Sequence, residues 1–191
     1  NVQPEASTLP LAENFVDYRN ILDLLIKFKP TNYKIFYKEH PLTFNLQKEA
    51  YLCKHKNFYL DLENKDIIFI KSNYDVYKLI KHSKFVLTAT GSVGPEALIR
   101  GKLVLNFGIS WWRNFKNVTN IQKESDLKEF FKLLEAGDTK FSPSNIESDI
   151  LKTYKKSINF PFFYEENLSR FLKNDFINSS VALELKKEFS R

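Results

Sequence analysis

The sequence predicts an α/β fold built on a parallel sheet with helices on both faces, followed by a helical C-terminal extension. Segments with the helix period alternate with short apolar segments from Asn14 to Phe107. Strands that are separated by helices pair in parallel and are covered on both faces. Beyond Phe107 the pattern becomes helical. The 191 residues, 43% of them hydrophobic, are enough to bury a core, so we expect a Rossmann-like domain.

The first half of the chain supplies the expected elements in turn. Apolar residues recur at helical spacing from Asn14 to Phe28, and Pro30 ends that helix. The apolar run from Lys34 to Tyr37 is a short strand that ends in a polar turn. The following elements are a helix from Leu46 to Phe58, a buried strand from Asp66 to Ile70 and a helix from Tyr74 to His82.

A complete strand, turn, helix and strand then fall within about thirty residues, the minimum βαβ unit. The strand Phe85 to Leu87 breaks into the polar turn Thr88 to Ser92, and a helix follows from Val93 to Arg100. After Gly101 the second strand runs from Leu103 to Phe107. The turn offers hydroxyls and backbone N–H groups at a helix N-terminus, where phosphate commonly binds.

The C-terminal part reads as helical. Leu127, Phe130, Phe131 and Leu134 lie on one helix face, with Ser125 as the expected N-cap and Gly137 as the stop. Ser144 and Glu147 form a capping-box pair behind Pro143, which opens a helix through Ile150 and Tyr154, and the last thirty residues read as two more helices. We therefore divide the chain into residues 1–122, a Rossmann-like domain, and residues 123–191, a helical part that packs on the same domain.

Composition excludes several classes of protein. The net charge is +6, but the lysines are scattered among acidic residues, which argues against a nucleic-acid partner and fits a phosphorylated ligand or an anionic membrane surface. The single cysteine, Cys53, suits a reducing compartment, so we expect a cytoplasmic protein. Cys53 and His55 stand two apart, so no metal site is expected. No apolar run reaches the ~18 residues that span a bilayer.

The turn from Thr88 to Gly94 is the first candidate site. It is neither a P-loop nor the G-x-G-x-x-G motif. Gly91 permits a positive φ, and Gly94 permits close approach of a ligand to the backbone. Thr90 and Ser92 can cap the helix or donate to a phosphate oxygen, so an ordinary capped helix and a ligand site are both open. Glu96 either interacts with the helix dipole or accepts hydrogen bonds from sugar hydroxyls.

The turn Lys38-Glu39-His40-Pro41 is the second candidate site. Pro41 biases His40 toward an extended backbone, and a histidine preorganised in this way can stack on a base or bind phosphate. The alternative is a structural or merely exposed histidine, as we expect for His55 and His82. Both polar turns follow strands of a parallel sheet, whose carboxyl ends bind ligands, and we expect them to face one cleft.

The neighbouring tryptophans Trp111 and Trp112 cannot both point inward from a strand. They form a lid, an interface to another domain, or a cover for the sheet edge. Packing is the favoured interpretation.

Three motifs, in order and spacing, resemble bacterial capsule polysaccharide biosynthesis proteins, which include the Kdo transferases. They are QPEAST (Gln3 to Thr8), YKEHP (Tyr37 to Pro41) and TATGSVGPEALIRGKLVLNFG (Thr88 to Gly108). The resemblance implies that this chain is the C-terminal, nucleotide-sugar-binding half of a GT-B glycosyltransferase. The chain contains no methionine, and we expect the N-terminal domain to lie upstream.

The resemblance also implies roles for individual residues. His40 and Pro41 border the nucleotide, often CMP, and Gln3 and Glu5 match a motif near the interdomain cleft. We add Lys38, from the same turn as His40, to the expected nucleotide-binding residues. The phosphate is cradled at the helix start by Thr90, Gly91, Ser92 and Val93. From the residues themselves, Gly94 and Glu96 join the expected nucleotide- and phosphate-binding set. Because the catalytic group of such enzymes commonly comes from the other domain, no catalytic residue is assigned. The nucleotide sugar is a substrate, so no cofactor is expected.

Other functions stay open. Pro95 before Glu96 and the paired tryptophans depart from many relatives. Glycerophosphotransferases that use CDP-glycerol and UDP-GlcNAc 2-epimerases share parts of the pattern, and a non-catalytic binding module is a further alternative. For the leading hypothesis, the expected partners are a nucleotide-sugar donor and a polysaccharide or glycolipid acceptor, with peripheral contact at the inner face of the cell membrane.

Overall fold

A computed structural model describes residues 11–40, 43, 56–63, 65, 67–138 and 146–156 of the chain. The chain divides into two compact units, residues 1–146 and residues 147–191. In the second unit the described residues belong to α7 (Ile146–Lys156), which begins at the boundary.

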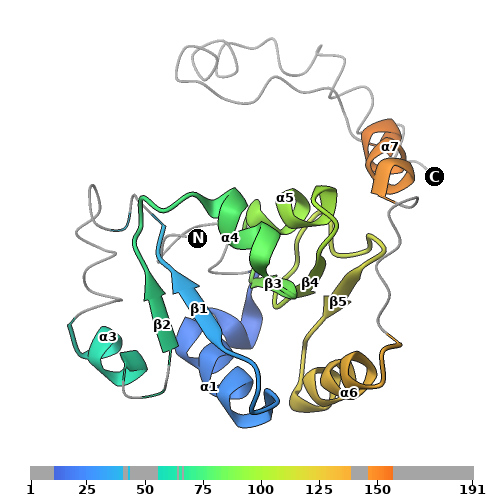
Figure 1. Cartoon of the computed structure of the whole chain (residues 1–191). Coiled ribbons are helices and arrows are strands. Elements are labelled where there is room, and N and C mark those ends of the chain that lie inside the picture. Colours follow the sequence, from blue (N-terminus) through green and yellow to red (C-terminus); the bar gives the residue numbers. More distant parts are fainter. Residues whose placement is uncertain are drawn as a thin grey trace. The chain divides into compact units, whose positions relative to one another are not determined.

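The first unit alternates helices and strands (Figure 1). In chain order its elements are η1 (Glu13–Phe15), α1 (Tyr18–Phe28), β1 (Ile35–Lys38), α3 (Lys56–Glu63), β2 (Ile67–Ile70), α4 (Val76–His82), β3 (Phe85–Thr88), α5 (Val93–Ile99), β4 (Leu103–Asn106), β5 (Val118–Asn120) and α6 (Glu124–Glu135).

The strands form two parallel sheets, β1-β2 and β3-β4-β5. In the first sheet Ile35 pairs with Ile67 and Lys38 with Ile70. In the second sheet Phe85 pairs with Leu103, and β4 pairs with β5 from Val104 to Asn106. Because all neighbours are parallel, the strands of each sheet end at the same edge.

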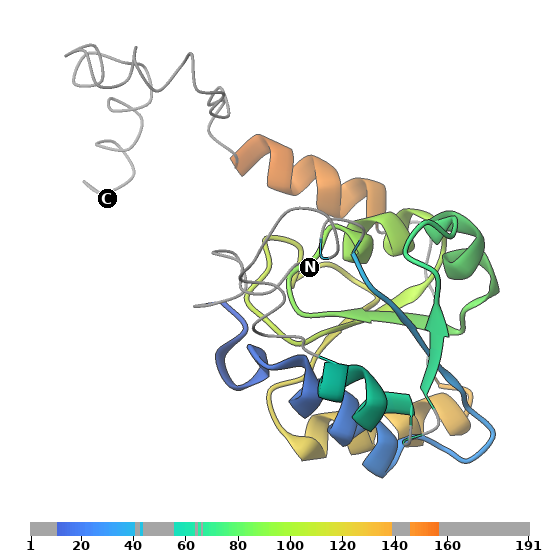
Figure 2. The same ribbon diagram turned by 90° about the vertical axis from the view of Figure 1, so that its left-hand side faces the viewer.

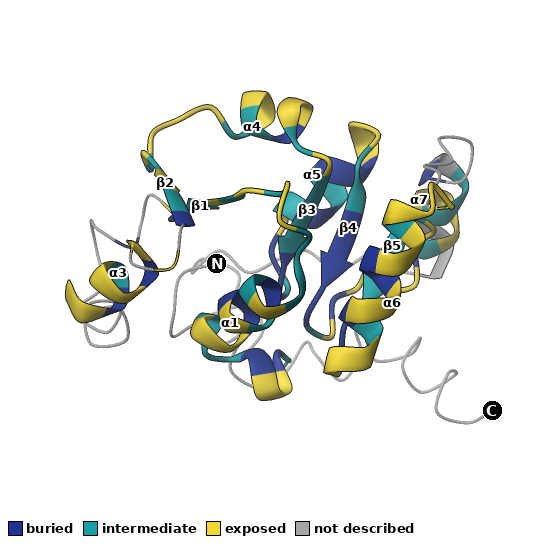
Figure 3. Cartoon of the chain, turned by 60° about the horizontal axis from the view of Figure 1, so that its bottom comes forward, coloured by how far each residue is buried: buried dark blue, intermediate teal, exposed yellow. Residues whose placement is uncertain are grey.

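Helices cover both faces of the β3-β4-β5 sheet. Neighbouring residues of β4 point to opposite faces, so Leu105 packs in one hydrophobic cluster and Val104 in another. The Leu105 cluster contains residues of α1, α3 and α6, and the Val104 cluster contains residues of α4 and α5. In Figures 1 and 2, α1 and α6 accordingly lie on one side of the strands and α4 and α5 on the other. Figure 3 shows β4 buried between its neighbours.

The predicted α/β fold with parallel strands and helices on both faces is confirmed. The strands expected over 34–37, 66–70, 85–87 and 103–107 are present within a residue. The structure adds β5, which the sequence analysis did not predict, and it divides the strands between two sheets.

Capping side chains explain where the helix boundaries differ. The Asp17 carboxylate accepts a hydrogen bond from the backbone N–H of Arg19, so α1 begins at Tyr18 and only the short η1 precedes it. Asp75 caps α4 in the same way through the N–H of Tyr77, which delays its start to Val76. The prediction of Ser125 as the N-cap of α6 is wrong, because the helix begins at Glu124.

Gly137 stops α6, as the sequence predicts. Gly137 has a φ of 76°, the left-handed conformation that glycine adopts most easily, and its N–H donates to the carbonyl of Leu134. The hydrophobic face of α6 packs in the same cluster as α1. The proposed division at residue 122 stays a prediction.

Several predictions lie outside the described residues. They concern Gln3, Glu5, Pro41, Cys53, His55, most of the helix expected over 46–58, the Ser144 cap and the two helices expected in the last thirty residues.

Candidate functional site

Polar residues end all three strands of the β3-β4-β5 sheet. Thr88, Asn106 and Asn120 stand in register as the last residues of β3, β4 and β5. Asn106 is buried, and its side-chain N–H₂ donates to Asn120 Oδ1 at 2.7 Å and to the Gly108 carbonyl at 2.6 Å. Apolar residues precede them in β3 and β4, so the polar row marks the carboxyl edge, where parallel sheets bind ligands.

Three donors of the turn between β3 and α5, all on Ser92 and Val93, make no hydrogen bond within the described part of the chain. The Thr88 hydroxyl accepts a hydrogen bond from the Gly91 N–H at 3.1 Å, which fixes the turn. Ser92 occupies the N-cap position, is exposed and makes no side-chain capping bond. Within the described residues, the N–H groups of Ser92 and Val93 make no hydrogen bond to the protein. Two amides and a hydroxyl at a helix start suit an anion such as phosphate.

One glycine of this turn differs from its prediction, and the other packs against a buried side chain. Gly91 does not adopt a positive φ, because among the described glycines only Gly101 and Gly137 do so. A Cβ added at Gly94 would lie 2.5 Å from Cζ2 of Trp112. The close approach at Gly94 is therefore to a buried indole ring, and the expectation of a close approach to a ligand is not needed to explain this glycine.

The two tryptophans point in different directions, as expected. Trp112 is fully buried, while Trp111 is 65% exposed and packs its ring edge-on against Phe115. Packing against α5 thus explains why Trp112 is buried, but it does not explain why Trp111 is exposed. The indole N–H of Trp112 has no hydrogen-bond partner in the part of the chain that the structure describes.

Glu96 lies in the first turn of α5 and is partly exposed. Its backbone N–H donates to the Ser92 carbonyl at 3.2 Å, and its carbonyl accepts from the Arg100 guanidinium. A favourable interaction with the helix dipole and a contact with a sugar hydroxyl both remain compatible with this position.

The end of β1 is organised around a buried carboxylate, which the sequence analysis did not single out. Glu39 is 5% exposed and accepts hydrogen bonds from the Tyr37 hydroxyl at 2.9 Å and the Tyr59 hydroxyl at 3.2 Å. The Thr43 hydroxyl and the backbone N–H of His40 also donate to it, each at 3.2 Å. Burial of Tyr37, followed by the charge of Glu39 and the hydrogen bond between them, raises the pKa of that phenol well above its ordinary value.

Two of the residues predicted in the Lys38 to Pro41 turn, Lys38 and His40, lie at the end of β1. Lys38 ends β1 and is partly exposed, and His40 is exposed with its backbone tied to Glu39. They follow the β1-β2 sheet, whereas Thr90 to Glu96 follow the β3-β4-β5 sheet. That the two turns face one cleft stays a prediction. His82 is exposed, as expected.

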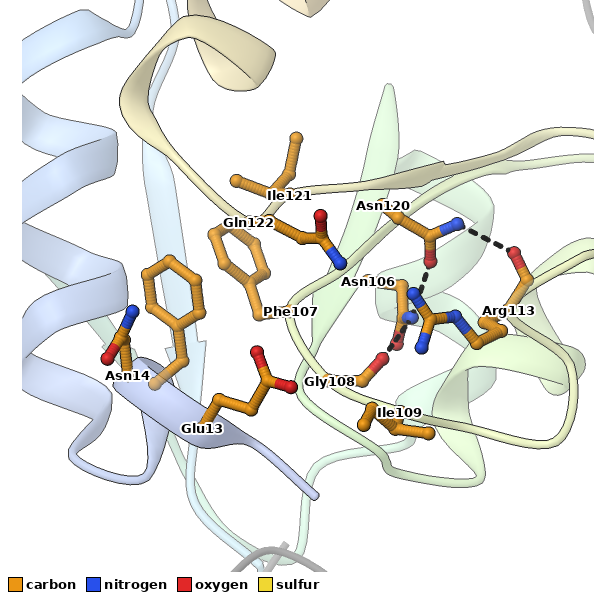
Figure 4. A pocket seen from close by; sticks show the side chains of 11 residues that line it. Glu13, Asn14, Asn106, Phe107, Gly108, Ile109, Arg113, Asn120, Ile121 and Gln122 are labelled. Atoms are coloured by element: carbon orange, nitrogen blue, oxygen red, sulfur yellow. Dashed lines mark hydrogen bonds between the residues drawn. The ribbon is translucent and has the colours of Figure 1, made fainter. Parts of the chain in front are cut away.

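A small pocket lies beside the polar row, at the ends of β4 and β5 (Figure 4). The pocket was not predicted from the sequence, although the strand endings LVLN and VTN carry a signal, because β4 and β5 each end in an asparagine. The pocket is lined by Glu13, Asn14, Phe15, Asn106, Phe107, Gly108, Ile109, Arg113, Asn120, Ile121 and Gln122.

The family comparison bears on this geometry. Residues 12–160 match the family model described as capsule polysaccharide biosynthesis protein. The chain belongs to this family. The match covers the η1 to α6 elements, both strand-end turns within the described residues and the pocket. No curated protein and no solved structure matches the chain.

Membership supports a biosynthetic role in the production of capsule polysaccharide. In the described part of the chain, no helix combines the length and apolar character needed to cross a membrane.

Proposed function

We propose that this member of the capsule polysaccharide family is part of a glycosyltransferase of the GT-B type. It transfers a sugar from a nucleotide-activated donor, with a CMP-sugar favoured, to a polysaccharide or glycolipid acceptor. The observation that carries the proposal is the start of α5, where the exposed Ser92 hydroxyl and the N–H groups of Ser92 and Val93 have no protein partner in the described residues.

The chemistry follows from the charge that develops during transfer. When the acceptor oxygen forms its bond to the anomeric carbon, the bond from that carbon to the phosphate oxygen breaks, and negative charge grows on the departing phosphate. Donors at Ser92 and Val93 stabilise that charge most strongly as it develops, which lowers the barrier. The group that takes the acceptor proton is assigned to the N-terminal domain of the two-domain enzyme.

The turn after β1 completes the donor site in this proposal. The exposed His40 residue lies on a backbone that Glu39 holds in place, and in this proposal its ring borders the nucleotide. Lys38 supplies a positive charge beside it. We place the protein in the cytoplasm, with peripheral contact at the inner face of the membrane, where a basic protein meets anionic lipid.

Calorimetric titration with CMP, UDP and their sugar conjugates tests the donor site. We expect one nucleotide family to bind and Ser92→Ala to weaken it about tenfold, because a hydroxyl that donates to phosphate is lost. Ser125→Ala, an exposed serine of α6, is the matched control and is expected to bind normally. Absence of binding by every nucleotide, or equal binding by Ser92→Ala, would sink the proposal.

Turnover by the intact two-domain protein separates an enzyme from a non-catalytic binding module. His40→Ala keeps the backbone N–H that bonds to Glu39, so we expect it to fold and to lose activity. An intact protein that binds a nucleotide sugar but never transfers the sugar would support the binding module instead.

A further inference from the structure

The positive charge of the chain is concentrated in the segment that contains α4 and α5. Residues 71–102 hold six lysines and arginines and two acidic residues, which leaves +4 of the chain's net charge of +6. All six cations are at least partly exposed, and in the described part of the chain none of them forms an ion pair. They are Lys71, Lys78, Lys81, Lys84, Arg100 and Lys102. Lysines that look scattered along the whole sequence are therefore gathered here by the fold.

Two contacts join the end of α5 to α4. The Arg100 guanidinium lies over the Tyr77 ring, 3.9 Å from its centroid, and donates to the Glu96 carbonyl at 2.9 Å. The Lys102 ammonium donates to the Lys81 carbonyl at 2.8 Å. Because neither a ring nor a carbonyl carries a formal charge, these contacts hold the cations in place without neutralising them.

Exposed apolar side chains lie among these cations. Tyr74, Tyr77 and Ile99 are 46%, 49% and 62% exposed. Tyr77 lies against Arg100 and Ile99 directly precedes it, so apolar and cationic groups share one surface. The opposite sides of the two helices pack in the Val104 cluster. Figure 3 shows the exposed positions of α4 and α5 in yellow.

Helix stability alone does not explain this arrangement. A lysine in the last turn of a helix interacts favourably with the helix dipole, which accounts for Lys81. Lys78 stands in the first turn of α4, where the dipole disfavours a cation, and Asp75 already caps that turn through the N–H groups of Tyr77 and Lys78. The exposure of Ile99 likewise gives nothing to the fold. A partner outside the chain explains both features.

We propose that this surface, formed by the exposed side chains of α4 and by Ile99, Arg100 and Lys102, docks on an anionic lipid bilayer. The cations attract the headgroups, and the tyrosines and the isoleucine enter the boundary between headgroups and acyl chains. The inference rests on the peripheral membrane contact of the proposed function and names the surface that makes this contact.

The apolar side chains favour lipid over another polyanion such as nucleic acid. The Ile99 side chain neither donates to phosphate nor stacks on a base, whereas it leaves water when it enters lipid. The Arg100 guanidinium already covers one face of the Tyr77 ring, so that face does not stack on a base. Charge complementarity together with exposed apolar groups therefore fits a bilayer best.

Part of this surface lies opposite the edge of the sheet that holds the polar row. Lys84 and Lys102 directly precede Phe85 and Leu103, which pair at the start of β3 and β4. These two cations therefore lie at the amino edge of the sheet, away from its carboxyl edge. Vesicle binding can be measured without any nucleotide, and Ser92→Ala is expected to leave it unchanged.

Co-sedimentation of the full chain with lipid vesicles tests the proposal. The probes are vesicles of phosphatidylcholine alone and of phosphatidylcholine mixed with phosphatidylglycerol. We expect the anionic vesicles to bind at least about tenfold more strongly than the neutral ones, and added salt to weaken the binding. A mixed-sequence oligonucleotide is the polyanion that lacks an apolar phase, and we expect it to bind more weakly than the anionic vesicles.

Variants locate the surface. The double variant Lys78→Gln with Lys81→Gln is expected to lower vesicle binding more than about tenfold, because each cation near an anionic bilayer contributes about fivefold. The matched control, Lys128→Gln with Lys132→Gln, removes the same charge from exposed lysines of α6 and should change binding by less than about twofold. Ile99→Ser keeps every charge and should lower vesicle binding about fivefold without affecting the oligonucleotide.

Three results would overturn the proposal: no binding to anionic vesicles, equal losses in the α4 and α6 double variants, or normal vesicle binding by Ile99→Ser. Oligonucleotide binding as tight as vesicle binding would also overturn it, because the surface would then recognise polyanions in general. A chain that binds CMP but no vesicles loses only this inference. A chain that binds vesicles through this surface but no nucleotide keeps the inference and loses the proposed donor site.

Discussion

The ends of β1 and β3 are both polar turns, but they use their polar groups in opposite ways. At the end of β1, the Glu39 carboxylate accepts hydrogen bonds from at least two phenols, a hydroxyl and a backbone N–H. At the end of β3, the Ser92 hydroxyl is exposed and caps nothing. The polar groups of the first turn bond to one another within the fold, whereas in the second turn the Ser92 hydroxyl makes no capping bond to the described part of the protein.

This difference distinguishes residues that stabilise the fold from exposed residues that can bind a ligand. A buried carboxylate is stable only when its lone pairs are occupied, so Glu39 belongs to the framework that supports His40. Exposed donors at a helix start exchange water for an anion at little cost. Substitutions at the first turn should therefore lower stability, and substitutions at the second should lower affinity.

The largest expected effect is at Glu39. Glu39→Ala leaves the hydroxyls of Tyr37, Tyr59 and Thr43 without this acceptor and opens a void, so we expect the free energy of unfolding to fall by about 3 kcal/mol. Urea denaturation measures it. Glu39→Gln, which keeps an acceptor oxygen, should lose less than half as much. An alanine variant as stable as the wild type would mean that the network does not support the fold.

The next effect is at Gly94. Gly94→Ala places a Cβ against the Trp112 ring, and overpacking of this kind is expected to cost about 2 kcal/mol in unfolding free energy. Gly137→Ala is the control, because a Cβ there meets nothing within 4 Å and only the φ of 76° penalises it, by about 1 kcal/mol. Equal losses in the two variants, measured by thermal unfolding, would contradict a steric role for Trp112.

The Tyr37 phenol makes the stability of the folded protein depend on pH. In the folded protein the pKa of this phenol is raised above its ordinary value of 10.0. The contribution of the phenol to the free energy of unfolding is therefore complete below pH 10 and is lost as the pH rises above 10. We expect unfolding free energy to fall by up to about 1.4 kcal/mol per pH unit from this group above pH 10. Tyr37→Phe should flatten that part of the profile. Identical alkaline profiles for the two proteins would exclude the coupling.

The smallest expected effect on stability is at Ser92. Ser92→Ala removes a hydroxyl that makes no capping bond, so unfolding free energy should change by less than about 0.5 kcal/mol. A loss above about 1 kcal/mol in the same denaturation series would show that this serine belongs to the framework, like Glu39.

Much of the fold was predictable because it depends on local patterns. The apolar strands and the period of α6 are visible in the sequence, and so is the glycine that ends it. The β5 strand was missed because it is only three residues long, partly exposed and not flanked by a turn signal of its own. The division into two sheets depends on contacts between distant segments, which periodicity does not contain.

The candidate site was predicted less completely. The turn at Ser92 was singled out because hydroxyls and glycines crowd there, but the packing of Trp112 against Gly94 was not foreseen. That contact joins α5 to a loop after β4, and no local sequence pattern predicts it. Glu39 was overlooked for the same reason, since its importance depends on which partners the fold brings to its side chain.

The most direct measurement is an NMR titration of the ¹⁵N-labelled protein with CMP. The N–H groups of Ser92 and Val93 are the proposed phosphate ligands, so their signals should shift downfield and saturate together, while those in β2 stay in place. Saturable binding that leaves Ser92 and Val93 unshifted, or no binding by CMP or any other nucleotide tested in its place, would contradict a nucleotide phosphate held at the start of α5.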